Sequence, residues 1–357
     1  MWGSSGRAGT CDHRLVNHGI RARAHEGVAR LAGADLDLAT LIDESIRLLD
    51  RALPHDAACW HTIDPATLVE TSFRVQDMPR PDAKVAEFAY LSTDYNTFTG
   101  LARGSRHAGL LSQATGGKLD LSPRYRALLR PNDIQGELRT ALVADGACWG
   151  CFAFFREAPH DFTEDERRFA DELSALLGRG FRSAGVRART AGGASSLWPG
   201  LLMFDEDRRV ASATSPAAKW LEELGFRGEL GQDVLPFAVV SVAERVRRDG
   251  DDVSARVLGE SGEWVQVLGS PATDGRVAII LQGATPPSVA PLLSAAYGLT
   301  ARERELTELV LHGCGTAEIA AQLFISPHTV QGHLKSIFTK TGVRSRRELV
   351  TRVFVPR

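Results

Sequence analysis

Residues 316–335 read Thr316-Ala-Glu-Ile-Ala-Ala-Gln-Leu-Phe-Ile-Ser-Pro-His-Thr-Val-Gln-Gly-His-Leu-Lys335, and this stretch decides the fold of the C-terminal part of the chain. Its apolar positions recur at helical spacing on both sides of a short break. At that break Ser326 is a favourable N-cap, and Pro327 follows at the first helical position, where a helix tolerates proline. Gly342 then ends the second helix. The stretch therefore predicts two helices joined by a tight turn.

Two capping signals predict one further helix on each side of this pair. Thr300 and Glu303 have the spacing of a capping box, and so do Ser345 and Glu348. We therefore expect residues 295–357 to form an all-α domain of four helices.

The helix that begins at Pro327 carries the candidate binding residues. The apolar stripe that we expect to pack inward consists of Val330, Leu334, Ile337 and Phe338. The opposite face suits the major groove of DNA, because cations meet phosphate or guanine and Gln reads adenine. The residues expected on that face are Gly332, Lys335, Ser336 and Thr339, with Gln331 and His333 at its edges. A mid-helix glycine costs about 1 kcal/mol relative to alanine. We interpret Gly332 as a residue that lets the helix backbone approach DNA closely. The alternative is that glycine arose here by neutral sequence drift at an exposed site.

The charge distribution favours a nucleic-acid partner. From Lys335 onward the chain has seven Lys and Arg residues against one acid, Glu348, whereas the whole chain has a formal net charge of −2. Basic charge is thus concentrated next to the proposed groove helix. A solvated basic tail on an ordinary helical bundle would have the same charge. It would not explain the helix caps, the tight turn and the apolar stripe that occur together here.

Residues 299–354 resemble the LuxR/GerE-type helix-turn-helix, a four-helix domain that ends many bacterial transcription regulators. The matching residues are Leu299-Thr300, Arg302-Glu303, Glu318-Ile319-Ala320, Leu323, Ile325-Ser326, Thr329-Val330, His333, Lys335 and Gly342-Val343. The family often has Lys where Gln331 stands and a larger residue where Gly332 stands. Sigma-factor region 4 has a similar helix pair, but this chain lacks the helical, aromatic-rich region that would precede it.

The resemblance implies double-stranded DNA as the partner. Gln331, Gly332 and Lys335 would enter the major groove, and Thr329, Lys340 and Arg346 would contact phosphates. The other residues of the predicted DNA-binding site are His333, Ser336, Thr339 and Arg344. The family's fourth helix commonly forms a homodimer, which implies a two-fold DNA site. Transcription regulation would add RNA polymerase as a further partner.

Composition places the chain among multidomain proteins of a reducing compartment. At 357 residues, 43% of them hydrophobic, two or three domains with real cores are expected. No run of about 18 apolar residues indicates a membrane span. The first residues lack an apolar signal core, so we expect a flexible tail and a cytoplasmic protein. Five scattered cysteines fit a chain without disulfides.

Two breaks divide the sequence. Residues 183–200 are rich in Gly, Ala, Ser and Arg, and residues 284–291 contain three prolines. The predicted organisation is a tail (1–29), a GAF-like sensory domain (30–185), a linker (186–199), a PAS-like domain (200–284), a second linker (285–294) and the helix-turn-helix domain (295–357).

In the first block the pattern predicts an α+β sensory domain. Helices are expected at residues 36–53 and from Thr163, where Glu166 completes a capping box. Strands are expected at 57–63 and 68–73, and 138–144 with 149–156 form a hairpin around Asp145-Gly146. The block resembles a GAF domain of the kind found ahead of LuxR-type domains in actinobacterial regulators. The residues that carry this resemblance are Glu137-Leu-Arg, Asp145-Gly146, Trp149-Gly150 and Phe162-Thr163.

The second block predicts a smaller α+β domain. Strand-like runs at 200–205, 209–212, 254–258, 264–268 and 277–282 surround a helix at 217–224. Their order resembles a PAS domain. The alternative is that this block continues the first domain.

Other motifs are set aside. Cys148 and Cys151 form a C-x-x-C that could be a redox pair or half a metal site, but strand residues three apart face opposite sides and further ligands are missing. His55, His61 and His107 could ligate haem, yet each is expected to be a surface or capped histidine. We find no sequence motif of a nucleotide-binding loop or of a phospho-receiver domain. We also find no residue pattern typical of a homoserine-lactone sensor or of a catalytic site.

We therefore expect a non-enzymatic transcription regulator whose sensory domains, with a small-molecule ligand, control DNA binding. The sequence requires no cofactor, and none is identified. The alternative is a ligand- or partner-binding sensor whose helix-turn-helix serves protein docking.

Overall fold

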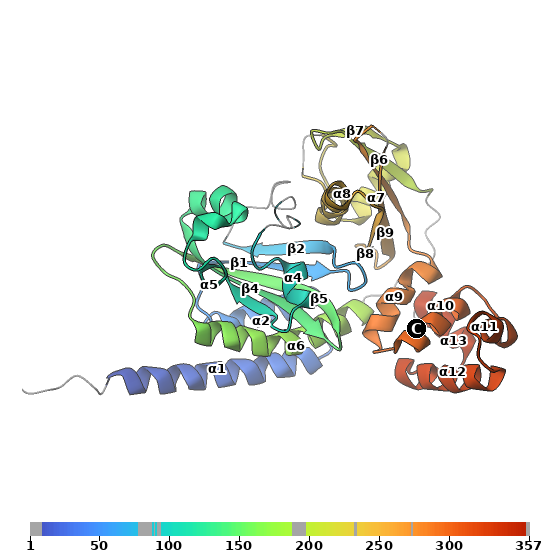
Figure 1. The fold of residues 1–357 in the computed structure, drawn as a ribbon, viewed down its shortest axis with the longest axis horizontal. Coiled ribbons are helices and arrows are strands. Elements are labelled where there is room, and N and C mark those ends of the chain that lie inside the picture. Colours follow the sequence, from blue (N-terminus) through green and yellow to red (C-terminus); the bar gives the residue numbers. More distant parts are fainter. Residues whose placement is uncertain are drawn as a thin grey trace, which may run out of the picture.

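The computed structural model describes residues 9–77, 88, 90, 94–187, 198–231, 234–272 and 274–354. They form three parts, which we name the first unit (9–187), the second unit (198–283) and the C-terminal helices (286–354) (Figure 1). Each of the first two units contains its own five-stranded antiparallel sheet. No helix in this described part combines the length and apolar character needed to cross a bilayer.

The first unit is built on a sheet of strand order β2-β1-β5-β4-β3. Its strands are β1 (Ala57–Ile63), β2 (Glu70–Gln76), β3 (Ala108–Leu110), β4 (Ile134–Ala144) and β5 (Ala147–Glu157). The predicted hairpin is confirmed, because β4 and β5 pair across a two-residue turn. Asp145 and Gly146 have φ values of 51° and 77°, the left-handed conformation that such hairpin turns require.

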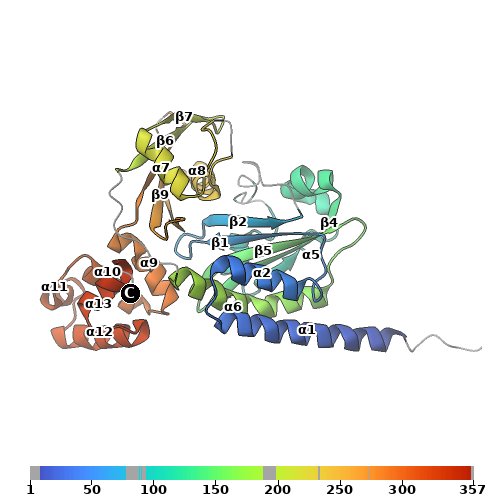
Figure 2. The same cartoon turned by 180° about the vertical axis from the view of Figure 1, so that it is seen from behind.

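Helices α2 (Leu38–Leu49) and α6 (Glu164–Arg187) cover one face of this sheet, and α1 (Gly9–Gly33) packs on the outer side of these two helices (Figure 2). The core on this face includes Trp60, Phe152 and Phe154 of the strands. Short elements cover the other face: α4 (Phe98–Arg103), α5 (Leu111–Ala114), and the turns η1 (Leu119–Leu121), η2 (Tyr125–Leu129) and η3 (Arg130–Asn132). The predicted α+β class is confirmed for this unit.

The predicted flexible tail over residues 1–29 is wrong from residue 9 onward, where α1 begins; residues 1–8 lie outside the described part. Ala24 and Val28 of α1 are buried in the same core as α2 and α6. Gly27 lies so close to Leu48 that an added Cβ would stand 2.8 Å from a leucine methyl. Small residues let α1 pack closely, and they give a weak hydrophobic signal in the sequence.

The predicted helix after Thr163 is confirmed and runs to Arg187. Glu166 accepts from the Thr163 backbone N–H at 2.8 Å, and the Glu166 N–H donates to the Thr163 hydroxyl at 3.3 Å, which completes the capping box. Residues 188–197 of the predicted linker lie outside the described residues.

The second unit repeats the strand order of the first, as β7-β6-β10-β9-β8. Its elements are β6 (Gly200–Phe204), β7 (Val210–Ala213), α7 (Ser215–Glu223), α8 (Phe237–Asp249), β8 (Val253–Leu258), β9 (Trp264–Pro271) and β10 (Val277–Gly283). This sheet is separate from that of the first unit, but the core around Trp220 and Val239 also includes Val69 of the first unit. A separate domain and a continuation of the first domain therefore both stay predictions. Helix α8 was not predicted from the sequence. The PAS-like character of the unit stays a prediction.

The C-terminal helices are α9 (Pro286–Ala296), α10 (Ala301–Leu311), α11 (Thr316–Gln322), α12 (Pro327–Thr341) and α13 (Arg346–Phe354). The predicted linker 285–294 is helical from Pro286 onward, where α9 begins. Prolines are tolerated in a first helical turn, so Pro286 and Pro287 do not prevent a helix. Leu292 of α9 is buried against Leu311 of α10, which gives the segment a reason to fold.

Candidate DNA-binding site

Local capping fixes the ends of the two helices that form the turn. The Thr329 N–H donates to the Ser326 hydroxyl at 3.0 Å, and Pro327 occupies the first turn of α12, as predicted. At the other end Gly342 has φ 68°, a left-handed C-cap that favours glycine. Helix α11 begins after Gly315, whose N–H donates to the Glu318 carboxylate at 2.6 Å.

The apolar stripe of α12 is buried as predicted and fixes which face points outward. Val330, Leu334 and Ile337 are at most 2% exposed, and Phe338 is partly buried. They pack with residues of α10, α11 and α13 in one core. Because this core holds one side of α12, the opposite side faces solvent (Figure 1).

Most of the predicted DNA-binding residues lie on that free side. The exposed ones are Thr329, Gln331, Gly332, Lys335, Thr339, Lys340 and Arg344, whereas His333, Ser336 and Arg346 are half-buried. A Cβ added at Gly332 would meet no atom within 4 Å. The glycine is therefore not required by packing within the chain.

Ser336 and Lys340 are turned toward α10 and not straight out to solvent, so the predicted outward orientation of Ser336 is wrong. Glu303 of α10 is 3% exposed and accepts from the Ser336 hydroxyl at 2.7 Å and from Lys340 Nζ at 2.7 Å. Burial alone would raise the pKa of Glu303, but the hydrogen bonds from Lys340, Ser336 and Thr300 hold this pKa down to about 2. A buried carboxylate thus draws two side chains of the predicted site toward itself.

A second hydrogen-bonded group joins α11, α12 and α13. Arg346 donates to the Cys314 carbonyl at 2.9 Å and to the Thr316 hydroxyl at 3.0 Å. The same Thr316 hydroxyl accepts from Gln331 Nε2 at 3.3 Å. Gln331 and Arg346, which the sequence places on different helices, are therefore brought to one point at the N-terminus of α11.

The matches with known proteins fall on these helices. Residues 298–353 match the family model described as bacterial regulatory proteins, luxR family. The spore germination protein GerE of Bacillus subtilis is 46% identical over 52 residues, which cover 15% of this chain and 70% of that protein. The chain belongs to the luxR family of bacterial regulatory proteins. The resemblance predicted from the sequence is confirmed.

The other matches also cover only part of the chain. The monoamine regulon transcriptional regulator of Klebsiella aerogenes is 50% identical over 58 residues, or 16% of this chain. The chain spans about a quarter of that relative's length, because the match covers 26% of it. A GAF domain from a phosphoenolpyruvate-protein phosphotransferase of Coxiella burnetii is 17% identical, with 47% of this chain and 96% of that one covered and a TM-score of 0.34.

The C-x-x-C motif of β5 differs from expectation in one respect. Cys148 and Cys151 lie in the same apolar cluster, not on opposite faces. A register shift, in which Leu142 pairs with Gly150 and Val143 with Cys148, leaves Trp149 out of the alternation. Both thiols are free and buried, and burial raises the pKa of Cys148 to about 12. A thiol that stays protonated is a poor nucleophile.

His61 is neither a surface histidine nor capped, so that expectation is wrong. Its Nδ1 lies 2.9 Å from the Glu70 carboxylate, and both side chains are 4% exposed. Burial lowers the pKa of His61, but Glu70 overrides it and raises the pKa to about 10. The imidazolium packs against Phe98 of the first unit and Phe237 of the second. His55 and His107 are capped, as expected, because the Nδ1 atom of each ring bonds a backbone carbonyl.

The described residues include no group of three or more His, Cys, Asp or Glu side chains arranged to hold a metal ion. Sequence reasoning also missed a buried ion cluster in the first unit. There Arg124 bonds Glu137 at 2.8 Å and Asp94 at 2.7 Å. Arg139 lies 3.2 Å from Glu137 and supplies the second cation, so the two arginines balance the two carboxylates. The cluster holds the short elements on the sheet.

Proposed function

We propose that this chain is a transcriptional regulator whose α12 enters the major groove of promoter DNA. The observation that carries the proposal is the solvent-facing side of α12, where Gln331, Gly332 and Lys335 stand together on a helix whose other side is locked into a core. In helix-turn-helix proteins the second helix of the pair reads base edges. Lys335 suits guanine or phosphate, and Gln331 suits adenine.

The other predicted residues take supporting roles in this proposal. Thr329 and Arg344 are exposed at either end of the turn-and-helix surface and would contact phosphates. Lys340 would reach a phosphate only by leaving Glu303, and Arg346 only by leaving Thr316. We expect these two to orient the helices first and to contact DNA second.

Family membership supports two further parts of the proposal. The chain would bind as a homodimer to a two-fold DNA site, with half-sites set by the dimer geometry. It would act in the cytoplasm, where bacterial promoter DNA lies. RNA polymerase is the partner through which it would alter transcription.

We assign residues 30–185 and 200–284 to signal sensing, with control passing through α9. This helix packs on α10 through Leu292 and Leu311. At its end Ala296 is buried in the core of the first unit, beside the α1, α2 and α6 residues. A change in either sensory unit would therefore shift the population of arrangements open to the LuxR-type domain.

The test is DNA binding by the full chain to the region upstream of its own gene, with a salt titration. We expect the affinity to fall steeply with salt, because neutralised phosphates release counterions. Lys335→Ala should weaken binding by roughly 1–3 kcal/mol if the lysine contacts a base. Lys219→Ala is the matched control, since Lys219 is an exposed lysine on α7 of the second unit. Equal affinities for wild type and Lys335→Ala would contradict the proposal.

One observation favours a second candidate function, docking to another protein. Phe324, between α11 and α12, is 94% exposed. An aromatic side chain this open is common at protein–protein contacts. If this chain forms a complex with another protein, docking predicts that Phe324→Ser abolishes the complex. It also predicts that Lys335→Ala leaves the complex intact.

A further inference from the structure

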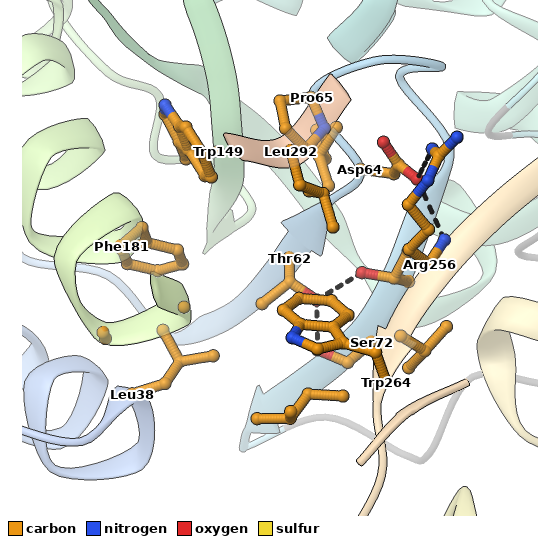
Figure 3. Close-up of a pocket in the computed structure, with 16 residues that line it drawn as sticks. Leu38, Thr62, Asp64, Pro65, Ser72, Trp149, Phe181, Arg256, Trp264 and Leu292 are labelled. Atoms are coloured by element: carbon orange, nitrogen blue, oxygen red, sulfur yellow. Dashed lines mark hydrogen bonds and ion pairs between the residues drawn. The ribbon is translucent and has the colours of Figure 1, made fainter. Parts of the chain in front are cut away.

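A cavity of about 210 Å³ lies where the three parts of the molecule meet (Figure 3). The first unit contributes Thr62, Trp149 and Phe181, the second contributes Arg256 and Trp264, and α9 contributes Leu292. No single unit could form this cavity alone. It is separate from the DNA-binding face of α12.

The lining is mostly apolar, includes three aromatic rings and carries no unpaired charge among the described residues. Trp149, Phe181 and Trp264 present ring surfaces to the cavity. The two charged lining residues neutralise each other, because Arg256 Nη1 lies 2.7 Å from Asp64 Oδ2 and both side chains are at most 8% exposed. A charged ligand would have to compete with this pair in a desolvated setting. The cavity therefore favours an uncharged occupant.

The lining holds two buried indole N–H groups that have no acceptor among the described residues, those of Trp149 and Trp264. Figure 3 shows the nitrogen of Trp149 on the side of its ring that is turned away from Trp264, so Trp264 is the donor considered for a ligand. The hydroxyl of Thr62 is already paired with Thr71 and Ser72, each at 2.7 Å. By contrast, the indole N–H of Trp264 is buried without an acceptor among the described residues. Figure 3 shows the nitrogen end of this indole turned toward the side of the cavity where Leu38 lies. Buried donors without partners are rare and call for an explanation.

Size narrows the class of occupant. An engineered apolar cavity of roughly 150 Å³ accommodates benzene, and sites for drug-sized ligands begin at about 300 Å³. We propose that the cavity binds a small, uncharged aromatic molecule with a hydrogen-bond acceptor that takes the Trp264 N–H. The ring lies among Trp149, Phe181 and Trp264, and the acceptor points to the indole nitrogen.

This site deepens the proposed function, on which its regulatory meaning rests. Leu292 lines the cavity and is also buried against Leu311 of the LuxR-type domain. A ligand in the cavity would stabilise the arrangement in which α9 is docked between the units. Binding of the ligand itself does not depend on DNA, so the two proposals can fail separately.

The test uses acetophenone and ethylbenzene as probes and the full chain without DNA. The two compounds have nearly the same shape, and only acetophenone has a carbonyl acceptor. Isothermal titration calorimetry should give one site per chain, with acetophenone bound roughly threefold to tenfold more tightly, the range expected for one hydrogen bond. Trp264→Phe keeps the ring and removes the donor, so this preference should disappear. Trp198→Phe is the control, because Trp198 is 81% exposed and does not line the cavity.

A cavity-filling variant tests the location independently. Leu258 is a half-buried lining residue, and Leu258→Trp should abolish binding of both compounds. Three results would overturn the inference: no binding of either compound to the wild-type chain at millimolar concentration, unchanged binding by Leu258→Trp, or a preference for acetophenone that survives in Trp264→Phe.

Discussion

At the scale of single residues, positions on α12 that look alike in the sequence have different roles. Lys335 and Lys340 are both exposed lysines on the basic segment. Lys340 is committed to Glu303, whereas the described residues give Lys335 no salt-bridge partner. Helical periodicity places both lysines near the face proposed to bind DNA, and only the position of Glu303 on α10 gives them different roles.

Gly332→Ala is the residue-scale prediction. Alanine should stabilise α12 by about 1 kcal/mol, because a Cβ at this position meets no atom within 4 Å. If the glycine serves close approach to DNA, the same change weakens DNA binding. The two quantities are measured by thermal melting and by a DNA-binding titration of one preparation.

The control for this change is Gly19→Ala on α1, where an added Cβ makes only an ordinary contact of 3.6 Å with Arg23. This variant should also melt at a higher temperature while its DNA affinity stays unchanged. If the Gly332→Ala chain is stabilised and binds DNA as tightly as the wild type, the glycine has no role in DNA binding and is a product of neutral sequence drift.

At the scale of elements, α10 and α12 are joined by a buried carboxylate. Glu303 caps α10 through Thr300 and bonds two residues of α12. Because a paired, buried charge is costly to disrupt, this residue fixes how the groove helix lies on its neighbour. The same carboxylate is therefore a pH-sensitive point in the LuxR-type domain.

The element-scale prediction concerns acid. The pKa of Glu303 is lowered from 4.5 to about 2 in the folded chain. A lowered carboxylate pKa stabilises the fold above the unfolded value and loses this stabilisation as the pH falls from about 4.5 toward 2. The melting temperature of the wild type should fall toward that of Glu303→Gln across this window.

Glu305→Gln is the matched control for the acid experiment. Glu305 is a half-exposed carboxylate on the same helix, paired with Arg302 at 2.7 Å, and exposed pairs contribute little. Its difference from the wild type should stay small at every pH. A wild-type minus Glu303→Gln difference that does not change between pH 6 and pH 3 would contradict the role of Glu303.

At the scale of the whole molecule, the first and second units meet through buried polar contacts. Asp64 accepts from the Arg256 backbone N–H at 2.9 Å as well as from its guanidinium. Arg248 of α8 donates to the Tyr90 carbonyl of the first unit at 3.1 Å. These contacts, with the His61–Glu70 pair beside Phe237, orient the second unit on the first.

The whole-molecule prediction is the response to Arg256→Met. Removing one partner leaves the Asp64 charge buried and unpaired, which should destabilise the inter-unit contact by about 3–5 kcal/mol. We expect a larger radius of gyration by small-angle X-ray scattering. Asp64→Asn added to Arg256→Met should recover part of the loss, because the buried charge is gone.

Arg276→Met is the control for the scattering experiment. Arg276 pairs with Asp274 at 3.0 Å, and both side chains are about half exposed, so its loss should leave the radius of gyration unchanged. An Arg256→Met chain as compact as the wild type would show that this ion pair does not hold the units together.

The sequence by itself determined the elements whose signals are local. The caps at Thr300, Ser326 and Thr163, the turn at Asp145-Gly146 and the stripe of α12 are set by residues within one or two turns of each other. The same local signals were enough to recognise the family. They also placed most of the candidate DNA-binding residues on one face.

Only the tertiary structure decided the features that depend on segments far apart in the chain. Helices α1 and α9 were predicted as a tail and a linker, because small residues weaken the hydrophobic pattern of α1 and prolines occur in α9. The residues that bury these helices lie on other elements of the chain. The pairing of Ser336 and Lys340 with Glu303 and the shared face of the two cysteines likewise follow from neighbouring elements. The cavity is formed by residues of three parts of the chain, so no local sequence pattern could predict it.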